Sequence, residues 1–442
     1  MISTYKFNFS KTLKSISTRN LALFLFAFFL SVSNSFSSII IIFFFISLIN
    51  SKDLNKNLNR VINNKVNQSI SIFFLYILLS YFWKENNFFQ DTIIKYSILL
   101  LVPLLDVLNF KNKDKEVAKY FFIGGVLFNI LYSIIISFLY KLRIINNLYF
   151  LKTDHYENIL FLRGFIDHSN LSVFIAFSIF LLIDFLFNQK KITRLNIIVF
   201  ILIFIQILFL LNGYGRTGLF IFITLFPIYI IIKNPKKIKL ILSISIVTLI
   251  ILISISSPFV DRIKTTFYMS QTTSNDEKIK KDAIYMSDSL GHGVKYWEKM
   301  INKDIKWKNE IIKKNEKSSL EKRFLIWKNY KAPLLNKKWF GEGAGGVKKI
   351  TNEQKIKYPH NSYIYIITEF GIIGMLLFIN IFYSLFKNYT DEGKKNILKF
   401  IFPILFLLCM MINDYLIIYN TACFLSLFIF LFYTGGAKLK SS

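Results

Sequence analysis

The chain has 442 residues, of which 54% are hydrophobic and 17% aromatic, and its mean hydropathy is +0.46. A water-soluble protein of this size would need far more polar surface, so the composition excludes an ordinary soluble enzyme. In a soluble domain, the formal net charge of +29 would suggest nucleic acid as a partner. Here most basic residues flank apolar stretches, where they set topology and meet anionic lipid. We therefore expect membrane lipids, and no nucleic acid, as partners.

Apolar stretches close to the length that crosses a membrane recur along the whole chain. Serines between residues 31 and 38 break the first long stretch and predict a tight hairpin there. A cleaved signal peptide is the alternative, disfavoured because no small-residue cleavage site stands out. We expect about twelve transmembrane helices, over residues 18–34, 36–50, 69–83, 92–110, 117–140, 166–187, 195–211, 217–232, 239–257, 361–386, 397–412 and 415–436.

Basic residues alternate between the two sides of this predicted topology. The termini and every second loop hold 25 Lys and Arg, whereas the short loops of the opposite side hold 7. This asymmetry predicts that both termini lie in the cytoplasm. The long polar stretch over residues 258–359 then lies outside, in the periplasm of a Gram-negative cell. Its charge does not oppose this orientation, because long translocated loops escape the charge rule.

The fold class that follows is an all-α, polytopic membrane protein. We expect three regions: an N-terminal bundle of about nine helices over residues 1–257, a large, partly helical periplasmic loop over 258–359, and about three helices over 360–442. Cys409 and Cys423 lie inside apolar stretches, which favours small core residues over a disulfide or metal pair. We expect no metal and no cofactor, since no carboxylate cluster stands on the outward side.

Two outward-facing helix starts carry a cation. Residues 212–218 combine three glycines with Arg216, where glycine lets the backbone approach a ligand and a guanidinium can bind phosphate with two parallel hydrogen bonds. Arg163 and His168 stand at another outward start and could line the same site. The alternative for all three is an anchor among lipid headgroups.

Two further features lie in and after the long loop. Arg323 stands in a basic amphipathic stretch, where a solvated helix face is the alternative interpretation. His360 and Asn361, followed by Tyr363, immediately precede an apolar helix. A histidine at this interface can accept a proton near neutral pH, or can simply cap the helix. All four features fall on the same side of a topology that was derived without them.

The spacing of these motifs resembles the O-antigen ligase family. Arg323-x-x-x-Trp327, the glycine-rich 341–346, and His360-Asn361 followed after nine residues by Gly371-x-x-Gly374 resemble the family's large external loop and next helix. Residues 215–218 resemble its Ser-Arg-Thr-Gly turn, with glycine in place of serine. Residues 164–170 resemble the segment that opens a middle span, with His-Ser-Asn where His/Asn-Pro-Asn is more usual. O-antigen polymerases share the superfamily and much of this pattern.

The resemblance implies a membrane glycosyltransferase of the all-helical, GT-C-like class in the bacterial inner membrane. The donor would be a glycan on undecaprenyl diphosphate, and the acceptor a sugar hydroxyl of the lipid A core. Arg216 and Arg323 would hold the diphosphate, and His360 would orient or deprotonate the acceptor hydroxyl. Such enzymes invert the anomeric carbon and need neither metal nor nucleotide. Growing negative charge on a leaving diphosphate does require fixed cations nearby.

Two other functions stay open. A polymerase that joins lipid-linked repeat units is barely separable from a ligase by sequence. A transporter or flippase would need ionisable residues deep in the spans. Asp106 and Asp184 are the main acidic residues within the apolar stretches. Both lie toward the cytoplasmic ends of their predicted helices, where polar contacts at the helix end or within the bundle account for their presence. The long loop is also unusual for a simple carrier, so an enzyme is favoured.

Overall fold

The computed structural model describes residues 17–49, 54–84, 87–144, 165–189, 193–212, 215–233, 319–354, 358–393 and 396–434. Every regular element in these ranges is a helix and none is a strand, which confirms the all-α prediction. The chain divides into two compact units. The first contains residues 1–246 and 332–442, and the second contains residues 247–331. The predicted three-region division stays a prediction.

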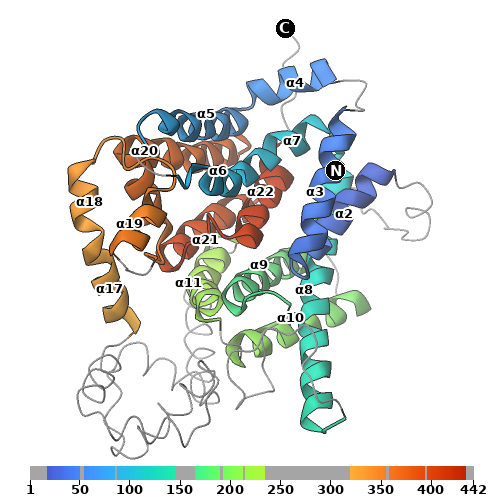
Figure 1. The fold of residues 1–442 in the computed structure, drawn as a ribbon. Helices are drawn as coiled ribbons and strands as arrows, with labels where there is room; N and C mark the ends of the chain where they lie inside the picture. The colour runs from blue at the N-terminus through green and yellow to red at the C-terminus, as the bar shows by residue number, and fades with distance from the viewer. Residues whose placement is uncertain are drawn as a thin grey trace, which may run out of the picture. The chain divides into compact units, whose positions relative to one another are not determined.

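The helices are drawn in Figure 1 and follow the predicted apolar ranges closely. Each predicted span contains a described helix except 239–257, which lies outside the described residues. The α-helices are α2 (Thr18–Phe29), α3 (Asn34–Ile49), α4 (Leu54–Asn63), α5 (Lys65–Leu79), α6 (Phe89–Ser97), α7 (Leu101–Val107), α8 (Asn112–Lys141), α9 (His168–Phe187), α10 (Arg194–Asn212), α11 (Arg216–Lys233), α17 (Ser319–Asn329), α18 (Lys331–Asn336), α19 (Gly346–Gln354), α20 (Ser362–Asp391), α21 (Leu398–Ile412) and α22 (Tyr419–Tyr433).

Within the described ranges, six helices are long and apolar enough to cross a membrane, or seven if the bent pair α3 and α4 counts as one span. The shorter apolar helices α2, α21 and α22 accompany them. The predicted hairpin is confirmed, because α2 ends at Phe29 and α3 begins at Asn34. The range 92–110 differs from prediction: it is divided between α6, a short 3-10 turn and α7. A total of twelve spans stays a prediction.

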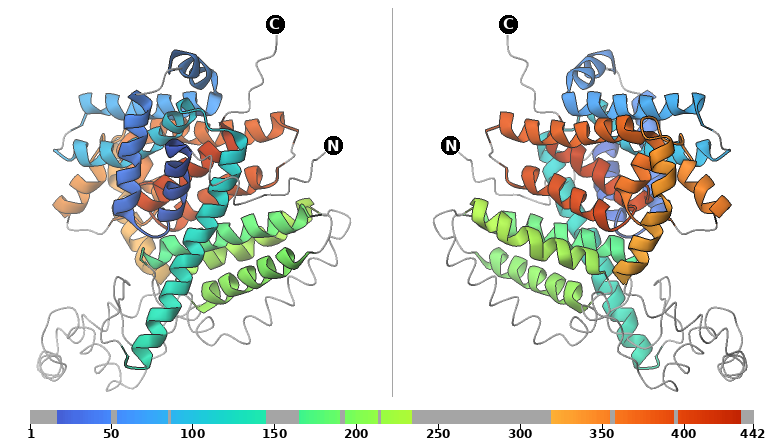
Figure 2. Two further views of the ribbon diagram at one scale, coloured as in Figure 1. Left: turned by 90° about the vertical axis from the view of Figure 1, so that its right-hand side faces the viewer. Right: turned by 90° about the vertical axis from the view of Figure 1, so that its left-hand side faces the viewer.

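Contacts between helices define two ends of the first unit. Helices α9 and α11 run parallel, because Gly218 donates to Ser172 near their starts and Tyr229 donates to Asp184 near their ends. Figure 2 shows these two helices side by side with α10. Helix α5 runs antiparallel to α20, since Tyr76 near the end of α5 donates to a carbonyl in the first third of α20. We call the end with the starts of α9, α11 and α20 the His360 end, and the opposite end the Arg60 end.

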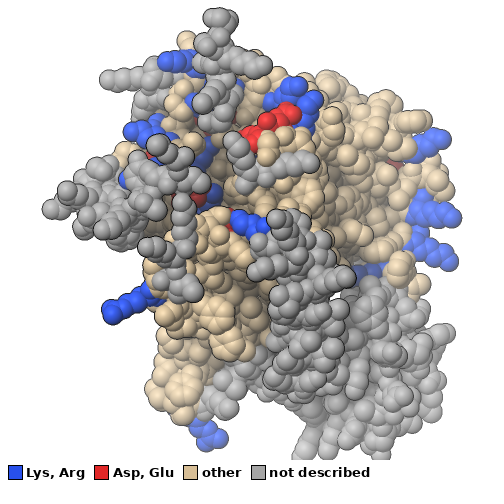
Figure 3. All heavy atoms as spheres, turned by 180° about the vertical axis from the view of Figure 1, so that it is seen from behind, with Lys and Arg blue, Asp and Glu red and all other residues tan. Residues whose placement is uncertain are grey.

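Aromatic side chains fill the core where α8, α9, α21 and α22 meet. The ring of Phe428 lies 4.9 Å from that of Phe122 and 4.7 Å from that of Phe177, both edge-on. Such edge-to-face contacts add to the stabilisation from burial alone. At the periphery, Phe200 is 65% exposed, and the face in Figure 3 is mostly uncharged where it is described. An apolar periphery around an aromatic core fits a lipid environment.

Helix α20 is broken at Gly371, whose φ of 62° and ψ of −164° are not helical. A break inside an apolar segment leaves backbone groups that must find partners within the protein. The glycine-rich turn before α19 supplies them. Gly343 donates to the Glu369 carbonyl at 2.8 Å, and Ile372 donates to the Lys338 carbonyl at 2.8 Å. The loop therefore completes the hydrogen bonding of the broken span.

Side chains and tight backbone contacts strengthen this junction. The Glu369 carboxylate is fully buried and accepts the Gly345 N–H at 3.1 Å. Gly371 cannot carry a Cβ, which would overlap the Trp339 carbonyl. Gly371 therefore lies against the backbone of the preceding loop, whereas Gly374 lies tightly against Tyr76 of α5. The two sequence motifs 341–346 and 369–374 are two halves of one structural junction.

Candidate functional site

The start of α20 is fixed by Asn361. Its side-chain oxygen accepts the N–H groups of Tyr363 at 3.0 Å and Ile364 at 3.2 Å, which caps the helix. Its amide nitrogen donates to the Met411 carbonyl at 3.1 Å, so the cap is also tied to the end of α21. Capping by asparagine explains why the helix begins here rather than at the preceding histidine. Asn361 thus holds the position of its neighbour His360.

His360 presents its imidazole at this end with a defined orientation. Its side chain is 47% exposed, and its φ of 48° is unusual for a residue with a side chain. Its Nδ1 lies 3.3 Å from Asn413 Oδ1 and 4.0 Å from Asp414 Oδ2. Asn413 Oδ1 also accepts the Asp414 N–H at 3.0 Å, which identifies it as an acceptor. In the neutral tautomer that fits this contact, Nδ1 carries the proton and the lone pair lies on Nε2.

Asp414 is the functional candidate that the sequence analysis missed. Its side chain is 9% exposed, and its Oδ1 accepts the Asn361 N–H at 2.8 Å. A carboxylate held by a backbone N–H beside an imidazole can stabilise the charge that the imidazole gains when it takes up a proton. One signal could have found it: Asn413-Asp414 is the polar pair between the last two predicted spans, at the same predicted side as His360.

Arg216 is the first residue of α11 and is exposed. The glycines beside it do not serve the purpose that the sequence suggested. A Cβ on Gly215 would overlap the Ser172 side chain, and one on Gly218 would overlap the Ser172 backbone. These glycines therefore allow α11 to pack closely against α9, rather than allowing backbone to approach a ligand. This packing fixes the backbone position of Arg216.

His168 lies at the same end, as the first residue of α9. Asp167 caps the helix by accepting the Ser169 N–H at 2.8 Å. The His168 Nδ1 lies 3.7 Å from Asp167 Oδ2, with 28% of the histidine side chain exposed. The His168 carbonyl lies directly against Gly215, the residue before Arg216. His168 and Arg216 are thus brought to adjoining helix starts.

The remaining predicted site residues are Tyr363, Arg323 and Arg163. The Tyr363 hydroxyl donates to the Leu407 carbonyl at 2.8 Å, which gives this side chain a packing role between α20 and α21. Arg323 lies in α17 of the second unit, where Phe324 and Trp327 pack edge to face at 5.1 Å. Arg163 lies outside the described residues. The structure therefore joins His168, Arg216, His360, Asn361 and Tyr363 at one end of the first unit.

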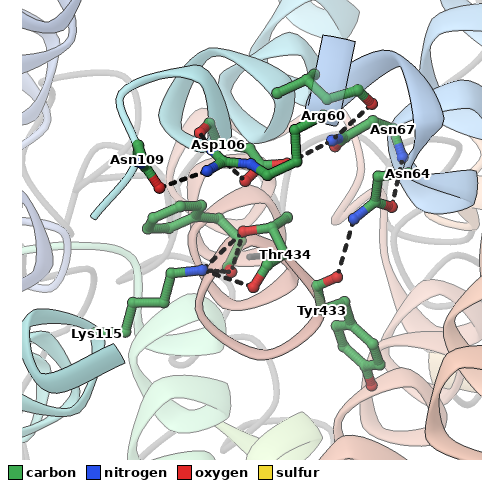
Figure 4. A network of polar contacts seen from close by, with 10 residues as sticks. Arg60, Asn64, Asn67, Asp106, Asn109, Lys115, Tyr433 and Thr434 are labelled. Carbon is green, nitrogen blue, oxygen red and sulfur yellow. Dashed lines mark hydrogen bonds and ion pairs between the residues drawn. The ribbon is translucent and has the colours of Figure 1, made fainter. Parts of the chain in front are cut away.

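The Arg60 end has a different chemistry, shown in Figure 4. Arg60 donates to the Asp106 carboxylate at 3.4 Å, to its backbone carbonyl and to Asn109. Asn67 donates to the other Asp106 oxygen at 2.8 Å. Lys115 is 3% exposed and donates to the Thr434 carbonyl at 2.8 Å, beyond the last turn of α22. Arg60 and Asn67 thus hold the Asp106 carboxylate, while Lys115 caps the end of α22.

The two acids that the sequence analysis considered for a transporter, Asp106 and Asp184, are also paired. Asp106 lies in the network just described, and Asp184 accepts from Tyr229 at 2.8 Å and Lys233 at 3.1 Å. Both acids therefore make contacts within the bundle, as expected. Among the described residues, no group of three or more His, Cys, Asp or Glu side chains could hold a metal ion. Cys409 and Cys423 are buried free thiols.

A protein-family model matches part of the chain. No curated protein matches the chain. The family model described as O-antigen ligase matches residues 198–379, a range that contains Arg216, Arg323 and His360 but not His168 or Asp414. A domain of this family indicates a membrane enzyme of the O-antigen ligase or polymerase type. The match over residues 198–379 confirms the resemblance to the O-antigen ligase family that the motifs indicate.

Proposed function

We propose that this protein is an O-antigen ligase that transfers a glycan from undecaprenyl diphosphate to a sugar hydroxyl of the lipid A core. The reaction forms a bond between the acceptor oxygen and the anomeric carbon. It breaks the bond from that carbon to the diphosphate oxygen and inverts the anomeric configuration. The observation that carries this proposal is His360, exposed and oriented by Asn413 and Asp414 within a chain whose residues 198–379 match the ligase family.

His360 is the catalytic base in this scheme. Its Nε2 accepts the proton of the acceptor hydroxyl as the new glycosidic bond forms. Asp414, held by the Asn361 N–H, stabilises the positive charge that the imidazole gains. General base catalysis of this kind contributes roughly 10² to 10⁴ in rate.

Arg216 and Arg323 hold the diphosphate in this scheme. Arg216 is exposed at the start of α11, where the positive end of the helix dipole adds to its own charge. Two guanidinium groups can bind phosphate oxygens in pairs and stabilise the leaving diphosphate without a metal ion. Arg163 and His168 line the same side. The reacting face is the periplasmic face of the inner membrane, with both termini in the cytoplasm.

The test is a transfer assay with purified protein in lipid nanodiscs. The donor is a glycan on undecaprenyl diphosphate, and the acceptor is core lipid A. We expect glycan on core lipid A from wild type. Arg216→Gln should raise the KM for the donor and lower kcat, because its charge acts on both the bound and the departing diphosphate. Unchanged kinetics in Arg216→Gln would remove it from the site.

The products also separate ligase from polymerase. Longer lipid-linked chains, with no glycan on core lipid A, would show that the enzyme joins repeat units instead. Absence of either product, with folded protein and substrates that a known ligase accepts, would overturn the proposal. The same assay with a metal chelator should leave the rate unchanged, since two arginines take the role of the cation.

A further inference from the structure

The turn over residues 413–418, between α21 and α22, contacts two of the helix starts that carry predicted site residues. Asn413 and Asp414 contact the start of α20, as described above. The next residue, Tyr415, is fully buried and faces a different helix. Its hydroxyl donates to the Ser169 carbonyl, 3.3 Å away in the first turn of α9. Three successive residues thus join α20 to α9.

The first turn of α9 is joined in the same way to α11. The Ser172 hydroxyl donates to the Ser169 carbonyl at 2.7 Å and accepts the Gly218 N–H at 3.1 Å. Gly218 lies two residues after Arg216. A continuous series of hydrogen bonds therefore runs from Tyr415 through Ser169 and Ser172 to the first turn of α11. The same turn of chain that holds His360 is thereby linked to the helix that starts with Arg216.

We propose that Tyr415 is a positioning residue that sets the spacing between Arg216 and His360. This inference rests on the proposed function, in which one residue holds the donor diphosphate and the other activates the acceptor. Groups that act on one reacting centre must be placed accurately, and a misplacement of about 1 Å can cost up to roughly a hundredfold in rate. Tyr415 touches neither substrate in this scheme and acts through the backbone it holds.

Loss of a positioning residue changes the kinetics in a way that distinguishes it from a general loss of packing. Arg216 can still bind the donor and His360 can still bind the acceptor, so the KM for each substrate should stay close to wild type. The two groups no longer meet in the correct geometry, so kcat falls. A tyrosine that only fills the core would lower the amount of folded enzyme and leave the kinetics of the remainder unchanged.

The chain offers a matched control in Tyr433. Its side chain is 2% exposed, and its hydroxyl donates to the Lys399 carbonyl at the Arg60 end. Tyr415→Phe and Tyr433→Phe each remove one buried hydroxyl bound to a backbone carbonyl, and each keeps the ring. We expect the two variants to unfold at similar temperatures. We expect kcat to fall at least about tenfold in Tyr415→Phe and to stay within about twofold in Tyr433→Phe.

Hydrogen exchange of backbone amides on the same samples provides a readout that needs no substrate. Tyr415→Phe should speed exchange in both 165–172 and 413–418, whereas Tyr433→Phe should leave both segments unchanged. Equal kcat in the two variants, or a fall in Tyr415→Phe through KM alone, would overturn the positioning role. If wild type transfers no glycan, the proposed function fails. Unchanged exchange in Tyr415→Phe would then separately show that the tyrosine does not couple the two segments.

Discussion

The two ends of the first unit use polar side chains in opposite ways. At the Arg60 end, the ionisable groups are buried and bonded within the bundle: Asp106, 2% exposed, accepts from Arg60, and Lys115, 3% exposed, donates to the Thr434 carbonyl. At the His360 end, the Asp414 carboxylate is 9% exposed and lies 4.0 Å from an imidazole that is 47% exposed. Buried charge that is fully paired within the bundle is structural. Buried charge that presents an exposed, titratable neighbour is the arrangement that catalysis needs.

Backbone conformation does not separate the two ends. At the Arg60 end, Lys115 and Arg60 donate to carbonyls near the ends of α22 and α7, which is ordinary helix capping by cations. At the His360 end, a histidine sits in a left-handed conformation immediately before a capped helix. Asn109, which accepts from Arg60 at the other end, also has a positive φ, of 53°, so this conformation alone does not mark a catalytic residue.

The largest effect expected on function is at His360. Glycine adopts a positive φ without strain, so His360→Gly removes the imidazole and preserves the backbone. We expect transfer to fall about 10³-fold while the unfolding temperature changes little. Added imidazole should restore part of the rate, because it can occupy the space of the missing ring. Full activity of His360→Gly without imidazole would show that this end holds no base.

The largest effect expected on stability is at the opposite end. Arg60→Gln leaves the buried Asp106 carboxylate without its cationic partner, which should destabilise the protein by about 3 kcal/mol. The double variant Arg60→Gln/Asp106→Asn should recover part of this loss, because it removes the unpaired charge as well. Thermal unfolding in nanodiscs measures both. Transfer per folded molecule should match wild type. A loss of transfer per folded molecule in Arg60→Gln would contradict a purely structural role for the Arg60 end.

An intermediate effect is expected at the break in α20. Gly371 combines a glycine-only conformation with a backbone neighbour that leaves no room for a Cβ. Gly393 provides the control, since its φ is 73° and no atom lies within 4 Å of an added Cβ. Gly393→Ala should cost about 1 kcal/mol, and Gly371→Ala about 2 kcal/mol more. Equal losses would mean that the junction with the glycine-rich turn adds nothing to stability.

The smallest effect is expected at an exposed ion pair. Asp91 accepts a hydrogen bond from Lys348 at 2.5 Å, and this bond together with the lysine charge lowers the pKa of the carboxyl. A lowered pKa contributes stability above the unfolded value near 4 that is lost as pH falls through the folded value. Because the pair is exposed, Asp91→Asn should leave unfolding at neutral pH unchanged within error. A clear loss there would show that the pair is less screened than its exposure indicates.

Much of the fold could be predicted, because the length of an apolar stretch is a strong indication of a membrane helix. Most predicted ranges match described helices, including the early hairpin, although 92–110 is divided between α6, a 3-10 turn and α7. Breaks inside apolar ranges could not be predicted in the same way. The interruption at Gly371 depends on hydrogen bonds from residues 338–343, which lie about thirty positions earlier. Hydropathy along the chain carries no information about such distant partners.

The candidate site was predictable in part. His360 and Arg216 stood out because a cation or imidazole at an apolar helix start is chemically unusual. Asp414 and Tyr415 did not, because their roles come from contacts with Asn361 and Ser169 that only the fold creates. The purpose of the glycines beside Arg216 was misjudged for the same reason. A glycine allows another group to approach the backbone closely, but the sequence does not say which group. Here the group is Ser172 of α9, which only the fold places against these glycines.

One experiment tests the distinction between the two ends most directly. Wild type, His360→Gly and Arg60→Gln are compared for the rate of glycan transfer to core lipid A, each normalised to the amount of folded protein. We predict that Arg60→Gln matches wild type and that His360→Gly loses about 10³-fold. Transfer by His360→Gly at the wild-type rate, or an equal loss in both variants, would contradict the assignment of the reaction to the His360 end.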